Sequence, residues 1–166
     1  MPILDESTLE FLSHSPDQTR RVGARLGSLL KAGNVLCLNG DLGAGKTTLV
    51  QGIAQGWGSP DPVTSPTFVL INNYRRPDGQ QLSHLDAYRL ADALEAEALD
   101  IDYLLESGPL IVEWPKRILS ALPDNHLWVD LSYLSEQQRI LLIKPVGSPY
   151  KNIVIQLRKQ IFTGLL

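Results

Sequence analysis

The sequence contains a single cysteine, Cys37, among its 166 residues. One cysteine excludes an internal disulfide and any metal site built from several thiolates. Cys37 lies in the apolar run from Val35 to Asn39, which is typical of a strand buried on both faces. A thiol in such a strand usually serves as a small hydrophobic group of the core, and we expect that role here rather than a reactive nucleophile.

Long apolar runs and an excess of positive charge are also missing. No stretch approaches the length that spans a membrane, and the N-terminus has no basic region followed by an apolar one. The net charge of -3 argues against broad, nonspecific binding of nucleic acid, although it leaves room for a local basic site. We therefore expect a cytoplasmic protein that does not associate with membranes.

The length and composition are those of one globular domain. With 166 residues, of which 43% are hydrophobic, the chain can bury a sizeable core. We assign residues 1–147 to this domain and residues 148–166 to a C-terminal extension of unknown role. Within the extension, the segment from Ile153 to Leu157 indicates a strand.

The most informative stretch runs from Gly40 to Thr48 and reads Gly-Asp-Leu-Gly-Ala-Gly-Lys-Thr-Thr. It matches the phosphate-binding pattern G-x-x-x-x-G-K-[ST], in which backbone N–H groups cradle phosphates, the lysine reaches the outer phosphates and the hydroxyl of Thr47 can ligate Mg²⁺. A buried strand precedes the loop, and an apolar helical spacing from Leu49 to Trp57 follows it. A helix N-terminus would then point at the phosphates. Because both flanks fit, we disfavour the alternative of a glycine-rich turn that contains a lysine by chance.

Two predicted strands end in an acid. Leu110 to Val112 is an apolar strand that leads into Glu113, and Gln81 to Asp86 is the second half of a hairpin whose turn is Pro77-Asp78-Gly79. Ligands of open α/β sheets bind at the carboxyl ends of the strands, so both acids are candidates to position a metal ion or a water molecule. A solvated strand end is the alternative for Asp86, and we expect His84 to be structural.

Two further segments permit more than one interpretation. Ser65 and Thr67 flank Pro66 and belong either to a plain turn or to a switch-like loop that senses phosphate or metal. Trp114 has three possible roles: it belongs to the core, it covers the site, or it contacts a partner.

A second hairpin is predicted from Leu127 to Pro145. Together the segments predict an α/β protein of the P-loop NTPase fold, with a mixed central sheet (a parallel core with antiparallel hairpins) flanked by helices.

The order of these motifs resembles the bacterial TsaE family, also called YjeE. The resemblance rests on four segments in order: the loop from Gly40 to Thr48, Ser65-Pro66-Thr67-Phe68, the segment from His84 to Leu90, and Glu113-Trp114-Pro115. It covers roughly residues 15 to 147. Members of this family are small ATPases that are required for the threonylcarbamoyladenosine (t6A) modification of tRNA.

The resemblance implies a role for each matching residue. Lys46, Asp86 and Glu113 would be catalytic, Thr47 and Glu113 would hold Mg²⁺, and Ser65 and Thr67 would form a switch-like loop. Trp114 would lie beside the nucleotide, and the adenine would lie near the N-terminal end of the first helix and the turn at Ser135. The residues around the ATP phosphates would be Asp41, Leu42, Gly43, Ala44, Gly45, Lys46, Thr47 and Thr48.

The resemblance also implies a partner, the heterodimer of TsaD and TsaB type proteins that transfers the threonylcarbamoyl group, while direct contact with tRNA stays open. ATP hydrolysis would support repeated turnovers of that complex and would be slow without it. Two alternatives remain. A small-molecule kinase would need a lid with several arginines, and only Arg75, Arg76 and Arg89 lie between the loop and Glu113. A nucleotide-gated binding module would hydrolyse ATP only incidentally.

Overall fold

The computed structural model describes residues 7–64, 71–90 and 93–163. The predicted switch-like residues Ser65 and Thr67 lie outside these ranges. Among the described residues, no helix is long and apolar enough to cross a membrane. The helices are α1 (Pro16–Gly27), α2 (Lys46–Trp57), α3 (Ala93–Glu97), α4 (Ile101–Ser107), the 3-10 helix η1 (Pro115–Ala121) and α5 (Ser148–Phe162).

The strands form one sheet of seven, in the order β1-β7-β6-β2-β5-β4-β3. Strands β6, β2, β5 and β4 are parallel neighbours, whereas β1 pairs with β7, β6 with β7 and β3 with β4 in antiparallel fashion. This arrangement confirms the predicted mixed sheet with a parallel core and antiparallel hairpins. The strands are β1 (Leu9–Ser13), β2 (Val35–Asn39), β3 (Ile71–Arg75), β4 (Gln81–Asp86), β5 (Leu110–Glu113), β6 (His126–Tyr133) and β7 (Arg139–Val146).

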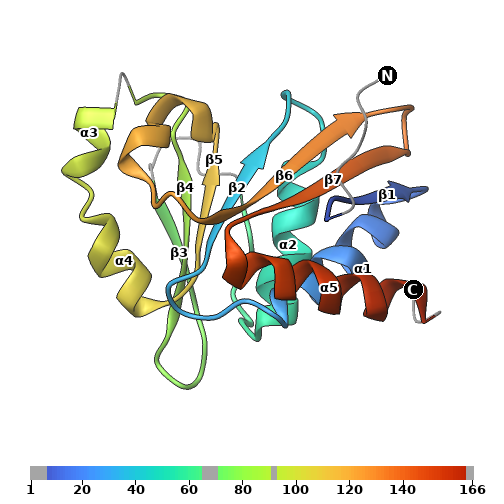
Figure 1. Ribbon diagram of the computed structural model, residues 1–166, viewed down its shortest axis with the longest axis horizontal. Helices are drawn as coiled ribbons and strands as arrows, with labels where there is room; N and C mark the ends of the chain where they lie inside the picture. Colours follow the sequence, from blue (N-terminus) through green and yellow to red (C-terminus); the bar gives the residue numbers. More distant parts are fainter. Residues whose placement is uncertain (1–6, 65–70, 91–92, 164–166) are drawn as a thin grey trace.

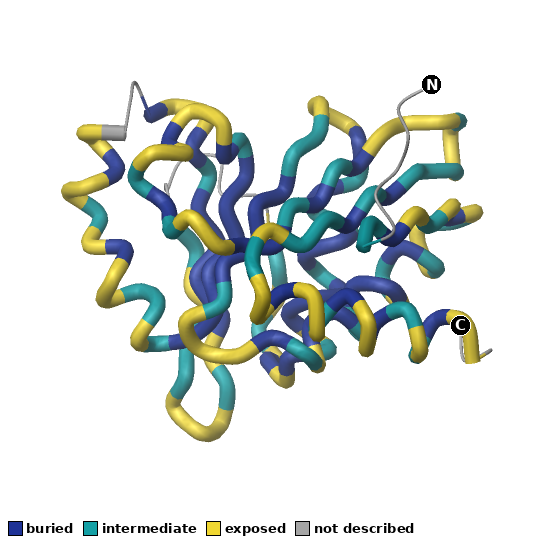
Figure 2. The backbone as a smooth tube through the Cα atoms, in the orientation of Figure 1, coloured by how far each residue is buried: buried dark blue, intermediate teal, exposed yellow. Residues whose placement is uncertain are grey.

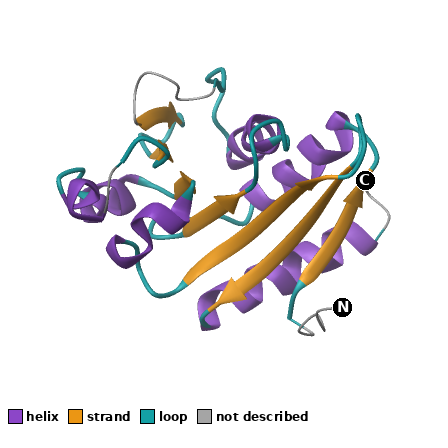
Figure 3. Ribbon diagram, turned by 90° about the horizontal axis from the view of Figure 1, so that it is seen from above, coloured by secondary structure: helices purple, strands orange, loops and turns teal. Residues whose placement is uncertain are grey.

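Helices cover both faces of the sheet, as Figures 1 and 3 show. One core cluster joins α1, α2 and α5 to the sheet, and a second joins α3, α4 and η1 to the other face of β2, β4 and β5. Strand β5 is buried throughout because its residues alternate between the two clusters, with Ile111 in the first and Leu110 and Val112 in the second. This double burial explains why the strand reads as a continuous apolar run. The buried positions concentrate in the central strands in Figure 2.

The C-terminal segment is helical, and the strand expected from Ile153 to Leu157 is wrong. A run of β-branched residues favoured a strand, but the buried positions of α5 are Tyr150, Val154, Leu157 and Ile161, which recur at the spacing of a helix face. These residues belong to the first core cluster. The hydroxyl of Tyr150 also accepts a hydrogen bond from the N–H of Val35 at 2.8 Å. The domain boundary at residue 147 stays a prediction, although α5 packs on the main core.

Helices α1 and α2 cross at very short range because glycines occupy the contact. A Cβ atom at Gly52 would lie 2.2 Å from the carbonyl oxygen of Arg20, and one at Gly27 would lie 2.1 Å from that of Ile53. Any side chain at either position would therefore collide with backbone. Since α2 begins at Lys46, this contact also sets where the N-terminus of α2 lies relative to the sheet.

We predict that Gly52→Ala destabilises the protein. Alanine raises the helix propensity of α2 by about 1 kcal/mol, but the collision with the Arg20 carbonyl must push the two helices apart and lose packing worth more than this gain. We expect a net loss of about 1–3 kcal/mol and a melting temperature lower by roughly 5 °C in thermal unfolding. Gln55→Ala, an exposed position on the same helix, is the control and should change little. A Gly52→Ala protein as stable as the wild type would contradict the contact.

We predict that Cys37 does not react in the folded protein. The thiol is fully buried in β2, and burial raises its pKa from 9.0 to about 12. At pH 8 only about one thiol in ten thousand is then ionised, and the thiolate is the species that reacts. Iodoacetamide should label the chain only after denaturation, as measured by intact mass. A Ser120→Cys variant supplies an exposed thiol as the positive control, and rapid labelling of Cys37 in the native wild type would refute the prediction.

Candidate functional site

Three parallel strands bring the predicted site residues to one edge of the sheet. The register pairs Leu38 of β2 with Glu113 of β5, and Glu113 with Asp86 of β4. The loop from Gly40 follows the end of β2 directly. The two acids therefore stand side by side next to the phosphate-loop sequence, at the carboxyl ends where ligands of α/β sheets bind.

The loop between β2 and α2 has the backbone of an anion-binding turn. Gly45 has φ 98°, a left-handed conformation that residues with a side chain rarely adopt. The N–H of Ala44 donates to the carbonyl of Asp41 at 3.1 Å and closes a tight turn. Helix α2 starts at Lys46 without a side-chain cap, so the N–H groups of its first turn point towards the loop. Such a terminus, with the positive end of the helix dipole, favours a negatively charged ligand.

Lys46 is held at the centre of the site. Its Nζ donates to the carbonyl of Gly40 at 2.8 Å, lies 3.8 Å from Glu113 Oε1 and sits 4.2 Å from the ring centroid of Trp114. The side chain is only 7% exposed, and burial lowers its pKa, an effect that the charges of Glu113, Asp86 and Asp41 oppose. The ammonium group thus stays within the site, where a ligand with its own negative charge would stabilise it.

Glu113 is fixed by a buried histidine. His84 Nε2 lies 2.7 Å from Glu113 Oε2, and because an ionised carboxylate only accepts hydrogen bonds, this nitrogen is the donor. His84 Nδ1 in turn lies 2.9 Å from the hydroxyl of Tyr74. The imidazole is fully buried and cannot reorient freely. One carboxylate oxygen of Glu113 is therefore occupied by His84, and the other faces Lys46.

Asp86 and Trp114 form the open side of the site. Asp86 Oδ1 accepts a hydrogen bond from the N–H of Tyr88 at 2.9 Å, which fixes the carboxylate at the end of β4. Trp114 has φ 58° and ψ 48°, an uncommon backbone conformation for a tryptophan, and it directs the chain from β5 into η1. Its ring packs on Tyr88 with 5.0 Å between the centroids. Trp114 lines the cavity next to Lys46 and also packs against the second core cluster, so its position fits both the covering and the core interpretation.

These residues surround a cavity of about 370 Å³. Its lining brings together most of the residues that the sequence analysis selected, and it also includes Arg139, which that analysis missed. The lining residues are Leu42, Gly43, Gly45, Lys46, Thr47, Thr48, Asp86, Glu113, Trp114 and Arg139. Of the remaining predicted residues, Ala44 is buried within the loop and Asp41 is exposed beside it.

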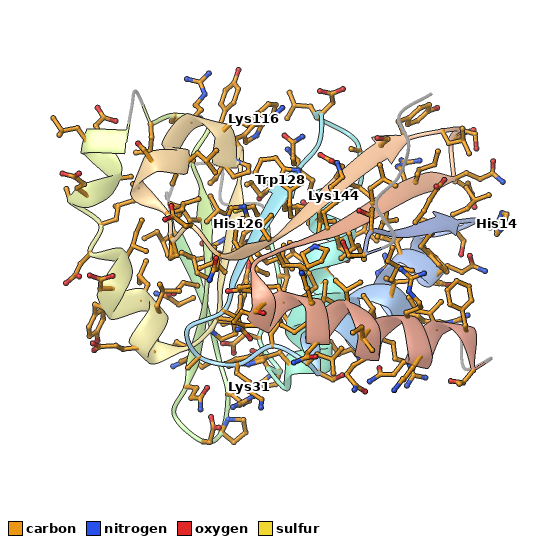
Figure 4. All side chains as sticks on the ribbon, viewed as in Figure 1. His14, Lys31, Lys116, His126, Trp128 and Lys144 are labelled. Carbon is orange, nitrogen blue, oxygen red and sulfur yellow. The ribbon has the colours of Figure 1, made fainter. Side chains whose placement is uncertain are left out.

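A second cavity, of about 640 Å³, lies on the other side of Leu42 and Trp114, between the loop, η1 and β6. Lys116 and Arg117 of η1 and Asp130 of β6 belong to its lining. Asp130 accepts hydrogen bonds from Asn39, Trp128 and Lys144. Lys116, Trp128 and Lys144 are labelled in Figure 4. The carboxylate of Asp130 is thus already paired within the protein, and the lining of this cavity contains none of Lys46, Asp86 and Glu113.

The described residues offer only a small set of oxygen ligands to a metal ion such as Mg²⁺. Within the described ranges, no group of three or more His, Cys, Asp or Glu residues is arranged to hold a metal ion. The cavity instead offers the Thr47 hydroxyl and the Glu113 oxygen that His84 leaves free. Mg²⁺ is commonly held by one or two protein oxygens together with phosphate oxygens and water, so this small set suffices.

Sequence reasoning missed Arg139 and the contact between His84 and Glu113. Both depend on pairings between strands that are far apart in the sequence. The sequence placed His84 on one face of the strand with Asp86 and suggested a structural role, but it did not identify Glu113 as the partner of His84, because the register of the sheet decides which residues of neighbouring strands meet. Nothing local marks Arg139, which lies just after a hairpin turn.

The chain was compared with known proteins. The family model described as threonylcarbamoyl adenosine biosynthesis protein TsaE matches residues 13–141. The chain is 35% identical over 152 residues to the tRNA threonylcarbamoyladenosine biosynthesis protein TsaE of Bacillus subtilis, covering 91% of this chain and 94% of the relative. It is 38% identical over 157 residues to the protein of that name from a Nostoc species, with the same coverage.

A solved structure agrees with these matches. The crystal structure of Bacillus subtilis YdiB superposes with a TM-score of 0.76 at 29% identity, covering 92% of this chain and 95% of that one. The sequence relatives span nearly the whole chain, and the solved structure has the same fold. The chain therefore belongs to the TsaE family.

Proposed function

We propose that this protein is a P-loop ATPase of the t6A tRNA modification pathway. One observation carries the proposal: Lys46, Glu113 and Asp86 converge around a cavity at the N-terminus of α2, directly behind a phosphate-loop sequence. Membership of the TsaE family supplies the pathway. We place the protein in the cytoplasm.

Different residues serve different steps of phosphoryl transfer to water. This reaction requires positioning of the reactants and charge neutralisation rather than covalent chemistry. The free N–H groups of the loop and of α2 bind the phosphates. Lys46 leaves the carbonyl of Gly40 and neutralises charge on the outer phosphates. Asp86 or Glu113 orients the attacking water, and Trp114 shields the site from bulk solvent.

Mg²⁺ would be held by Thr47 and by the free oxygen of Glu113, and it would supply further charge neutralisation at the phosphates. His84 keeps Glu113 in place for this task, because a carboxylate with one oxygen fixed loses less freedom when it binds a ligand. The glutamate takes the position where aspartate is commoner in this class of protein.

Exposed apolar residues at the open side of the cavity favour the binding of a partner protein there. Leu42 at the tip of the loop is 82% exposed, and Tyr88 at the other rim is 48% exposed. Apolar groups that project beside a catalytic cavity are suited to burial by another protein. We propose that the threonylcarbamoyl-transferring heterodimer, of TsaD and TsaB type proteins, covers this rim and completes the site, and that hydrolysis resets that complex between turnovers.

The kinase alternative receives little support. Arg75 pairs with Asp61, and Arg76 pairs with Asp78 at the β3–β4 turn. In Figure 1 that turn lies at the end of the molecule opposite the carboxyl ends of the parallel strands. Neither of these two arginines, nor Arg89, is among the residues that line the phosphate cavity, so the three arginines do not form a lid over it. Mass spectrometry of a metabolite mixture incubated with ATP would reveal a phosphorylated product if the protein were a kinase.

We predict that Lys46→Ala abolishes ATP hydrolysis. Release of inorganic phosphate from Mg-ATP should be slow for the wild type alone, faster with the heterodimer, and lower by about 100-fold or more in the variant, because a preorganised charge at the phosphates is lost. Lys31→Ala is the matched control, since Lys31 is exposed and lies at the far end of the molecule from Lys116 in Figure 4. Full-rate hydrolysis without the partner, or an active Lys46→Ala protein, would count against the proposal.

We predict that Asp86→Asn separates binding from hydrolysis. The amide keeps the shape and the contact with the Tyr88 N–H but lacks the charge that orients water, so ATP affinity should stay within about threefold while the hydrolysis rate falls by about 100-fold. Isothermal titration calorimetry and phosphate release measure the two quantities. If this variant still supports repeated rounds of tRNA modification, hydrolysis is incidental and the nucleotide-gated module is the better description.

A further inference from the structure

Arg139, the first residue of β7, forms hydrogen bonds with two segments of backbone. Its Nε donates to the carbonyl of Ala44 at 2.9 Å, and one terminal nitrogen donates to that of Gly43 at 3.3 Å. Its other terminal nitrogen contacts three carbonyl oxygens of the β6–β7 turn, those of Ser135, Glu136 and Gln138. The guanidinium also stacks on Tyr133, 4.8 Å from the ring centroid. One side chain therefore ties the phosphate loop to a hairpin turn that lies about ninety residues away in the sequence.

The charge of Arg139 is directed at neutral groups. Among the described residues, the guanidinium forms no ion pair, and its recorded partners are carbonyl oxygens. Arg139 borders the phosphate cavity and also a small adjoining cavity lined by Pro16, Thr19, Thr48 and Gln137. Arg139 is thus a cation without a carboxylate partner, and it lies between two cavities. Its positive charge favours the binding of an anion in one of them.

The contact with Ala44 fixes the orientation of a peptide plane in the loop. In a trans peptide, the carbonyl of one residue and the N–H of the next point in opposite directions. Because Arg139 holds the Ala44 carbonyl, the N–H of Gly45 is turned away from the guanidinium. The Gly43 carbonyl is held in the same way, which supports the turn that the Ala44 N–H closes on Asp41.

We propose that Arg139 is a positioning residue for nucleotide binding. Its planar fork holds the Gly43 and Ala44 carbonyls so that the loop is already shaped for phosphate before the ligand arrives, and it anchors the loop to the rigid β6–β7 hairpin. A loop that is preorganised binds its ligand with a smaller loss of conformational entropy. This inference rests on the proposed function, because it assumes that the loop binds a nucleoside polyphosphate.

The test compares Arg139→Ala and Arg139→Lys with Lys144→Ala. Lys144 is the matched control: it lies on the same strand with its side chain towards the opposite face, and its loss removes the same charge. Calorimetry measures the affinity for ADP and ATP, and hydrogen exchange reports on the amides of residues 41–48 in the nucleotide-free protein. We expect Arg139→Ala to weaken both nucleotides by about 10- to 100-fold and to accelerate exchange in the loop, while Lys144→Ala changes affinity less than about twofold.

The Arg139→Lys variant keeps the positive charge but removes the planar guanidinium group, so it distinguishes the effects of the two. A lysine is a point charge that cannot bridge two carbonyls and a turn, so we expect it to lose most of the affinity, like alanine. Wild-type affinity in Arg139→Lys would overturn the proposal, as would faster exchange confined to residues 134–138 with unchanged affinity. If the alanine variant does not fold, the lysine variant decides alone. Failure of the wild type to bind either nucleotide would instead refute the proposed function.

Discussion

The parallel register of β2, β5 and β4 is the constraint on which the site depends. It places Leu38, Glu113 and Asp86 in one row across the sheet, so that the end of each strand delivers a different part of the site to the same edge. A shift of one residue in β5 would turn Glu113 to the other face and break its contacts with His84 and Lys46. Burial on both faces prevents such a shift, because it would disrupt the two core clusters together.

The phosphate loop is supported from every side by groups that do not belong to it. The glycine contact between α1 and α2 sets the position of the helix whose N-terminus faces the cavity, since the backbones of the two helices touch. Beneath the loop, His84 and Tyr74 hold Glu113 through hydrogen bonds of 2.7 Å and 2.9 Å. From the start of β7, Arg139 holds two loop carbonyls. These groups surround a loop whose tip, from Asp41 to Gly43, is exposed.

Two charged residues of the site are buried, whereas the rim of the cavity is open to another molecule. Lys46 and Glu113 are almost completely buried, whereas Leu42 and Tyr88 project into solvent at the rim. Trp114 stands between the two zones, with its ring next to both Lys46 and Tyr88. A partner that buries the rim would therefore act directly on the residue that covers the buried charges, which gives a physical route from docking to catalysis.

The sequence by itself determined the elements that local patterns encode. The loop from Gly40 to Thr48, its flanking strand and helix, both hairpins and the acids at the ends of β4 and β5 could all be predicted, because turn chemistry, periodicity and the motif spacing act over short distances. Periodicity failed for α5, where β-branched residues masked a helical face that became evident once it packed on the core. Tertiary structure alone decided the contacts of His84 and Arg139 and the crossing of α1 and α2, because each joins residues distant in the chain. Such contacts follow from strand order, register and backbone packing, none of which any single segment specifies.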